Sequence, residues 1–258
     1  MAKHQDGRSD IGYLEMQAAV GITKHNGGFA ATRELLSLCH IEEARQVLNV
    51  GCGIGVGSAY IFRKYNCHVV GVDISEKMIE WSRLRAREEG VADKVEFRVA
   101  SVLELPFAVD QFDLVICESV LAFVEDKDRA IRECVRVTRP GGYVGLNETF
   151  FVNQASPEFI ERVQASMGSD VPTAADWQAL WEQSGLSERV VRLHEIDARA
   201  EIKDRIRWVG LRWTLRAWGR LFRLYLMHPE IRQSLREMFD APAGMLQQMG
   251  YGLFAGRK

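Results

Sequence analysis

The chain lacks the features that mark disordered, collagen-like or coiled-coil proteins. Only 6 of its 258 residues are proline, 47% are hydrophobic, and no internal repeat or low-complexity segment interrupts it. This is the composition of an ordinary globular protein, so we exclude those three classes. Because a single core can still grow to about 250 residues, we expect one large domain with an insertion rather than two independent domains.

Long apolar runs and paired cysteines are also missing. No run reaches the roughly 18 to 20 uncharged apolar residues that a membrane span needs, and the N-terminal MAKHQDGRSD cannot act as a signal peptide. The five cysteines are odd in number and include no C-x-x-C pair, which favours reduced thiols over zinc binding or a disulfide framework. We therefore expect a cytoplasmic protein with no metal site.

An excess of charge of one sign is absent as well. The 33 Lys and Arg residues face 35 Asp and Glu residues, which gives a formal net charge of -2. Such a chain has no global basic field to hold nucleic acid, so we expect no nucleic-acid partner. Any basic surface must be local.

What the chain does contain, between residues 45 and 150, is an alternation of short β-branched runs with longer helical patterns. Five runs read as buried strands: Gln46–Val50, His68–Val72, Val95–Val99, Phe112–Cys117 and Tyr143–Asn147. Helical patterns at 75–89 and 126–137 lie between them. The alternation predicts an α/β fold in which helices cover both faces of a parallel sheet.

The flanking parts of the chain are predicted to complete this domain. Residues 1–44 read as a helical cap that leads into the first strand. Residues 151–258 read as the second half of the same domain, with helices at 157–167 and 174–184, a sixth strand at 189–196 and a terminal run, GYGLFA, that can form a seventh. A helical insertion at about 200–238 precedes that last strand.

A glycine-rich loop follows the first predicted strand, in the stretch VLNVGCGIGVG at 47–57. Glycine removes the Cβ that keeps a ligand from the backbone, and the helix that begins near Ser58 offers unpaired N–H groups. Asp73 stands at the tip of the second strand, where a carboxylate can accept both hydroxyls of a ribose. The dinucleotide spacing G-x-G-x-x-G would need glycine at Val56 or Ser58, so a nucleoside is favoured over nicotinamide or flavin. A tight turn without a ligand is the alternative.

Residues 45–150 resemble class I S-adenosylmethionine-dependent methyltransferases, of the small-molecule UbiE/sterol methyltransferase-like group. The motifs that carry the resemblance occur in order: NVGCGIG, GVDIS, ELPF at 104–107, FDLVICESVLAFVED at 112–126 and the turn RPGG at 139–142. The resemblance implies a Rossmann-like, doubly wound sheet of seven strands with the last antiparallel. It also implies S-adenosyl-L-methionine as the cofactor and S-adenosyl-L-homocysteine as the product.

The resemblance further implies which residues contact the cofactor. The methionine portion would be contacted by Gly51, Cys52 and Gly53, and the ribose hydroxyls by Asp73. The adenine would lie against Ile74, Met78, Ser101 and Val102. The cofactor would also be lined by Glu118 and Ser119 at the end of the fourth strand, and Asn49 belongs to the same binding set. Met78 and Val102 fit the hydrophobic core equally well, and Cys52 fits as a small loop residue.

Two residues depart from the family pattern. Most members have aspartate where this chain has Asn49, and many have an acid where it has Ser101. Asn49 and Ser101 keep an oxygen that can accept a hydrogen bond, but they lack the negative charge of an acid. A charged acceptor makes a hydrogen bond roughly twice as strong as a neutral one. We expect weaker cofactor binding, and the alternative is a protein that has the methyltransferase fold but no catalytic activity.

Methyl transfer from a sulfonium is a direct displacement, so alignment in a dry pocket is the main task of such an enzyme. If the acceptor must lose a proton, the base is expected over the carboxyl ends of the strands. The candidates there are Glu148, which can also bind the acceptor, and Tyr13 and His25 in the N-terminal segment. A solvated loop carboxylate and a plain amphipathic leader helix are the alternatives.

The insertion carries a local positive charge. Between residues 199 and 223, eight basic residues face only Glu201 and Asp204, a local charge of +6. A helical wheel places five arginines on one arc and six apolar residues opposite: Arg205, Arg212, Arg216, Arg220 and Arg223 against Trp208, Leu211, Leu215, Trp218, Phe222 and Tyr225.

Two interpretations of this amphipathic segment stay open. Residues 205–225 can make a peripheral contact with an anionic membrane, which suits an enzyme of lipids, quinones or isoprenoids. Alternatively, Trp208 and Trp218 pack on the sheet or bind the acceptor while the arginines are solvated. Both versions predict a small, apolar or aromatic acceptor. A homodimer is compatible with either.

Overall fold

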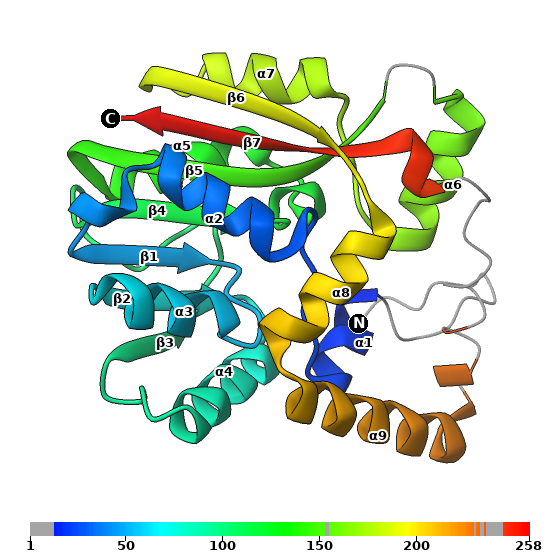
Figure 1. The fold of residues 1–258 in the computed structure, drawn as a ribbon. Coiled ribbons are helices and arrows are strands. Elements are labelled where there is room, and N and C mark those ends of the chain that lie inside the picture. The colour runs from blue at the N-terminus through cyan, green and yellow to red at the C-terminus, as the bar shows by residue number, and fades with distance from the viewer. Residues whose placement is uncertain (1–12, 153–154, 230, 233–234, 236–244) are drawn as a thin grey trace.

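The computed structural model describes residues 13–152, 155–229, 231–232, 235 and 245–258. It contains a seven-stranded sheet in the order β3-β2-β1-β4-β5-β7-β6 (Figure 1). The strands are β1 Gln46–Val50, β2 His68–Asp73, β3 Val95–Val99, β4 Phe112–Glu118, β5 Thr138–Phe151, β6 Ser187–Glu195 and β7 Met249–Arg257. Strands β1 to β5 pair in parallel, and β7 is antiparallel to both β5 and β6. The predicted Rossmann-like sheet is confirmed.

Helices cover both faces of this sheet, because apolar side chains alternate between the two faces along each strand. In β1, Val47 packs beneath α2 (Gly28–Leu38), α3 (Val56–Tyr65) and α4 (Glu76–Glu88). Its neighbour Leu48 belongs to the core on the other face, with α5 (Lys127–Val137) and α7 (Ala174–Glu182).

The turn expected at 139–142 is part of β5. The pairing of β4 with β5 shifts between Phe112 and Leu114, so these four residues bulge out of the ladder. Gly141 supplies the left-handed backbone there, at φ 79.

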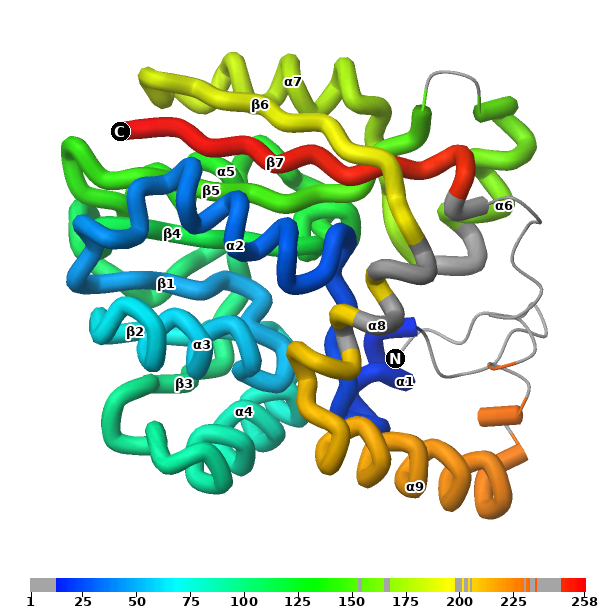
Figure 2. Tube along the Cα trace, viewed as in Figure 1, coloured from blue at the N-terminus to red at the C-terminus, as the bar shows by residue number. Residues whose placement is uncertain are grey.

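The remaining helices gather beside the carboxyl ends of the strands. Helix α1 (Tyr13–Val20) precedes α2, and α6 (Pro157–Met167) follows β5. Helix α8 (Ala198–Val209) lies beside α2, although the two are far apart in the sequence (Figure 2). Single 3-10 turns occur at Ile41–Glu43, Leu121–Phe123 and Met245–Gln248. None of the helices in the described part of the chain is long and apolar enough to cross a membrane.

The described part of the helical insertion predicted at about 200–238 is helical, and it is divided into two helices. Two helices occupy the described part, α8 and α9 (Leu211–Met227), and they meet at Gly210, whose φ is 90. A positive φ cannot continue an α-helix, so the chain changes direction there. Residues 230, 233–234 and 236–238 of the predicted insertion lie outside the described residues.

The orientation of α9 differs from that in one of the two interpretations that the sequence leaves open. Trp213 and Ala217 are buried against the protein, and Arg220 turns inward with them. Trp218, which that interpretation packs on the sheet or against the acceptor, is 65% exposed, and so is Phe222. The wheel identified the amphipathic pattern correctly, but the face that the protein covers is a different one.

Candidate functional site

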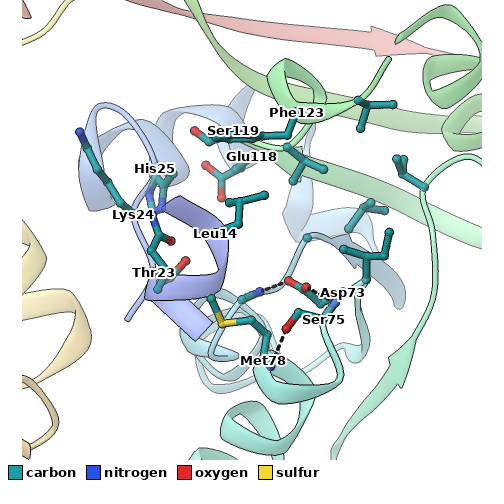
Figure 3. A pocket seen from close by; sticks show the side chains of 18 of the residues that line it. Leu14, Thr23, Lys24, His25, Asp73, Ser75, Met78, Glu118, Ser119 and Phe123 are labelled. Carbon is teal, nitrogen blue, oxygen red and sulfur yellow. Dashed lines mark hydrogen bonds between the residues drawn. The ribbon is translucent and has the colours of Figure 1, made fainter. Parts of the chain in front are cut away.

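A cavity of about 400 Å³ opens at the carboxyl ends of β1, β2 and β4, where ligands bind in open α/β sheets (Figure 3). Its walls come from α1 and the segment after it, from the loops after β1, β2, β3 and β4, and from β5. Among the predicted site residues that line it are Tyr13, His25, Gly51, Gly53, Asp73, Ile74, Met78, Ser101, Val102, Glu118 and Ser119. Folding therefore brings together eleven of these residues from six separate segments.

The glycine loop forms one wall by close backbone packing. Gly51 and Gly53 have φ values of 67 and 53, a conformation that residues with a Cβ rarely adopt. A Cβ on Gly53 would lie 2.6 Å from the Thr23 hydroxyl oxygen, and one on Gly51 would collide with the Val120 side chain. The loop accepts only glycine at these two places, and it exposes backbone to the cavity.

Asp73 ties this loop to the end of β2. Its Oδ2 accepts a hydrogen bond from the Gly53 N–H at 3.0 Å, and its Oδ1 accepts one from the Ser75 N–H at 2.9 Å (Figure 3). Burial raises the pKa of the Asp73 carboxyl, while these two N–H groups lower it. Each oxygen keeps a further lone pair, so the carboxylate can still accept two ligand hydroxyls.

Beside Asp73 lies an apolar slot for a flat group. Ile74 is 73% exposed and Met78 is buried, and both line the cavity together with Val102 and Leu103. The Ser101 hydroxyl accepts the Leu103 N–H at 3.2 Å, which holds the loop after β3 at the edge of the slot.

A polar network forms the opposite end of the cavity, around Glu118. The buried Thr32 hydroxyl lies 3.0 and 3.1 Å from the two Glu118 carboxylate oxygens, and Asn147 Nδ2 donates to Glu118 Oε1 at 3.3 Å. Ser119, the next residue, has the unusual φ of 56 for a side chain with a Cβ. The carboxylate is thus fixed at the cavity surface by neutral donors.

His25 joins the same network. Its Nε2 lies 2.8 Å from the Gly28 carbonyl oxygen and 3.0 Å from the Thr32 hydroxyl. Because the carbonyl can only accept, Nε2 carries a proton, and in the neutral ring Nδ1 then holds the lone pair. These contacts orient the imidazole as a group able to accept a proton.

Aromatic and aliphatic side chains close the rest of the cavity. The Tyr13 ring from α1 stacks on the Phe123 ring, with centroids 6.2 Å apart and an interplanar angle of 11°. Leu14, Val120 and Val124 continue this wall. It offers a ligand mainly apolar surface and so suits an apolar or aromatic group.

Two of the predicted cofactor contacts do not line the cavity. Asn49 is buried behind the glycine loop, where its Nδ2 donates to the Ser58 hydroxyl at 3.0 Å and holds the start of α3. Cys52 points into the core beside Ser82, and burial raises the pKa of its thiol, which stays protonated. All five cysteines lie in the described part of the chain, and each is buried and free.

Glu148, predicted as a base or acceptor contact, does not reach the cavity either. It is 0% exposed, and its carboxylate accepts hydrogen bonds from the backbone N–H groups of Val120, Leu121 and Ala122 at 3.0, 2.9 and 3.4 Å. The strand continues to Phe151, so this side chain faces inward instead of standing at a strand tip. Its role is to hold the loop that follows β4.

The two predicted acceptor contacts from the insertion are also displaced. Trp208 stacks on Phe29 with ring centroids 4.1 Å apart and packs α8 onto α2, outside the cavity lining. Trp218 points outward on α9. Neither residue is among those that line the cavity.

Sequence reasoning missed several residues that line the cavity. Thr23, Lys24 and Asn26 lie within two residues of His25, and Phe123 and Glu125 lie within the quoted motif FDLVICESVLAFVED. The signal was their closeness in sequence to residues already chosen. Which of them turn toward the cavity depends on the loop conformation.

Comparisons with known proteins agree with this geometry. Residues 48–146 match the family described as "Methyltransferase domain". Methyltransferase GfsG of Streptomyces halstedii is 35% identical over 119 residues, which are 46% of this chain and 43% of that protein. Phosphoethanolamine N-methyltransferase 1 of Arabidopsis thaliana is 33% identical over 122 residues, 47% of this chain and 24% of that protein. This chain therefore spans less than half the length of these two relatives.

Solved structures share the whole fold. The [4+2]-cyclase SpnF superposes with a TM-score of 0.73 at 19% identity, over 95% of this chain and 92% of that one. A SAM-dependent methyltransferase from Geobacter sulfurreducens, in complex with S-adenosyl-L-homocysteine, gives 0.69 at 22% identity, over 95% and 98%. At such identities the likeness concerns the fold.

Proposed function

Since this chain carries a class I S-adenosylmethionine-dependent methyltransferase domain, we propose that it transfers a methyl group from this cofactor to a small, apolar or aromatic organic acceptor. The observation that carries the proposal is the pairing of Asp73 with the Gly53 N–H at the wall of the cavity. This pairing places a carboxylate that can accept ribose hydroxyls beside a loop whose glycines, Gly51 and Gly53, have no Cβ to keep a ligand from the backbone. An acceptor binding beside the cofactor is the only partner that the proposal requires.

The residues present fit the cofactor. The cavity of about 400 Å³ falls within the roughly 300–1,000 Å³ typical of small-molecule sites. Asp73 would hold the ribose, the slot between Ile74 and Met78 the adenine, and Gly51 and Gly53 the methionine portion. S-adenosylmethionine would supply a methyl group bonded to a cationic sulfonium sulfur, which leaves as a neutral thioether when an acceptor displaces it.

The protein's own contribution is binding, orientation and exclusion of water. The stacked pair of Tyr13 and Phe123, with Leu14 beside it, would hold an apolar acceptor against the cofactor side of the cavity. Restricting two reactants to a near-attack geometry in a dry pocket is the main source of acceleration for a direct displacement. The apolar wall would therefore supply most of the surface that contacts the acceptor.

If the acceptor must lose a proton, the proposal assigns His25 as the general base. Its Nε2 donates to the Gly28 carbonyl, which leaves Nδ1 to take the proton, and Thr32 links the ring to the Glu118 carboxylate. A carboxylate connected through a hydroxyl stabilises the imidazolium that forms. Tyr13 then serves the acceptor as a ring surface, and Glu148 supports the loop.

The first test is calorimetric titration of the protein with S-adenosylmethionine and S-adenosylhomocysteine. We expect saturable binding that weakens at least tenfold in Asp73→Ala. The matched control is Asp93→Ala, because Asp93 is an exposed aspartate outside the cavity lining. No binding of either ligand at millimolar concentration would refute the proposal.

The second test measures transfer of a labelled methyl group to a panel of phenols, hydroxylated polyenes and prenyl compounds. We expect His25→Ala to lower kcat for acceptors that lose a proton, with cofactor affinity changed less than threefold. Cofactor binding without transfer to any compound of the panel would favour the alternative of a binding protein with this fold.

A further inference from the structure

The outer face of α9 carries a continuous row of large apolar side chains. Leu211, Leu215, Trp218, Phe222 and Leu226, called here the apolar stripe, are between 60% and 65% exposed. They recur every three or four residues, so they lie on one side of the helix along roughly 22 Å. Single exposed hydrophobic residues are ordinary, whereas a contiguous row marks a surface that meets another phase or partner.

Specific contacts fix the stripe in this outward orientation. On the opposite side of α9, Trp213 Nε1 donates to the Gly21 carbonyl at 2.8 Å, and Arg220 Nε donates to the Val20 carbonyl at 2.7 Å. The Arg220 guanidinium lies over the Trp81 ring, 4.4 Å from its centroid. Rotating α9 to hide the stripe would break all of these interactions.

The charge around the stripe has a single sign. Between Asp204 and Glu230 the sequence has six arginines and no acidic residue. Arg212 and Arg223 are exposed and flank the stripe on one side. Arg216, on the same flank, pairs with Glu88 of α4 at 2.7 Å. The surface thus combines the apolar stripe with a border of basic residues.

We propose that this face of α9 docks the protein on an anionic membrane surface. The stripe would enter the boundary between headgroups and acyl chains, with Trp218 at the interface, while Arg212 and Arg223 meet lipid phosphates. Helix α9 is an edge element of the molecule, so a flat surface can reach it along its length (Figure 1).

A second copy of the chain fits this face less well. The spacing 211, 215, 218, 222 would also suit a two-helix seam, but such seams are stabilised by opposite charges on their borders. The border here offers arginines and no carboxylate on α9, so pairing two copies brings in no attractive charge. An anionic surface satisfies both the stripe and its border.

Docking would bring the cavity close to the membrane. Met16 and Val20 of α1 pack against Ala217 of α9, while Tyr13 and Leu14 of the same helix line the cavity. One helix therefore separates the docking face from the site. The inference concerns α9 alone and does not depend on the proposed function.

The test is co-sedimentation of the full chain with vesicles of phosphatidylcholine, with and without phosphatidylserine. We expect binding to the anionic vesicles that falls at least tenfold between low and 0.5 M salt, because the Debye length shortens from roughly 30 Å at 0.01 M to a few ångströms. The double variant Trp218→Ser/Phe222→Ser and the double variant Arg212→Gln/Arg223→Gln should each lose at least tenfold in binding.

Matched controls change the same residue types elsewhere. Val99→Ser/Val109→Ser alters two exposed apolar residues outside α9, and Arg129→Gln/Arg162→Gln removes two exposed arginines of α5 and α6. Both controls should bind vesicles as the wild type does, and all four variants should keep the wild-type unfolding temperature within a few degrees.

Three results would overturn the inference. One is no sedimentation of the wild type with anionic vesicles. Another is an equal loss of binding in the α9 variants and their controls. The third is a dimer in analytical ultracentrifugation that the Trp218→Ser/Phe222→Ser variant converts to monomer without any vesicle binding, which would make a second copy the partner.

Discussion

Glu148 accepts the backbone N–H of Leu121 at a distance of 2.9 Å, and through this bond a strand of the sheet holds one wall of the cavity. The same carboxylate also receives the N–H groups of Val120 and Ala122. Phe123, which stacks on Tyr13, follows directly in the chain. A buried acid that no ligand can touch therefore sets the position of residues that a ligand does touch.

Glu148 should make the stability of the protein depend on pH. Burial raises the pKa of its carboxyl from 4.5 to about 7, although the three N–H groups and Lys127 lower it. The folded state then holds the proton more tightly than the unfolded state, so stability falls as pH rises from about 4.5 to 7. The loss from this group is on the order of 3 kcal/mol.

Urea denaturation of the wild type and Glu148→Gln between pH 4.5 and 8 checks this expectation. The amide does not titrate, so the difference between the two stability curves should shrink or reverse as pH rises and then stay constant above about pH 7.5. Parallel curves over the whole range would show that the pKa of Glu148 is the same in the folded and the unfolded state, which would contradict the expectation.

Gly53→Ala should damage the site far more than an equivalent change elsewhere. The new Cβ needs a left-handed backbone, which costs about 1–2 kcal/mol, and would also lie 2.6 Å from the Thr23 hydroxyl. Gly90 has a similar φ of 69 but nothing within 4 Å of its Cβ position, so Gly90→Ala measures the backbone cost alone. We expect both variants to lose stability and only Gly53→Ala to lose cofactor binding, by tenfold or more in calorimetry. Equal affinities would contradict the close packing of the loop.

Asn49 and Ser58 should act as one pair in stability. Their side chains are buried and bonded at 3.0 Å, and an unpartnered buried polar group costs about 1–3 kcal/mol. Asn49→Ala and Ser58→Ala should each destabilise by that amount, while the double variant should cost less than the sum of both. Chemical denaturation of the four proteins gives the coupling, and strict additivity would count against the bond.

Arg220 should resist replacement by lysine. Its planar guanidinium covers the Trp81 ring and donates to the Val20 carbonyl, and an ammonium group cannot reproduce that geometry. Arg220→Lys is expected to lower the free energy of unfolding by about 1–2 kcal/mol. Arg223→Lys, at an exposed position of the same helix, should be neutral in the same assay. Equal effects would mean that α9 does not depend on this contact.

Local pattern was enough to predict most of the framework. Runs of β-branched residues predict buried strands, and the strand, glycine loop and helix at 46–65 could be predicted from the sequence alone. Asp73 could be placed as well, because the end of the second parallel strand lies beside the end of the first. Both features depend on periodicity and on the geometry of neighbouring strands.

The direction in which a side chain points, and the group that it bonds to, could not be predicted from the local pattern. Asn49 and Cys52 are sequence neighbours of residues that line the cavity, yet their side chains are buried in the core. Glu148 lies inside β5, which extends beyond the β-branched run that predicted it. Whether such a side chain turns to a ligand or to a backbone N–H depends on what the distant loop places opposite it.

By itself the sequence determined the strands of the sheet, the glycine loop, the place of Asp73 at the end of β2 and the amphipathic nature of residues 211–227, because these depend on residues close together along the chain. Only the tertiary structure decided which side of α9 faces the protein. Trp213 and Arg220 find carbonyl oxygens at the end of α1 and the Trp81 ring, so that side is buried and the more apolar one remains at the surface. Contacts between distant segments fix this choice, since the helix alone fits either way.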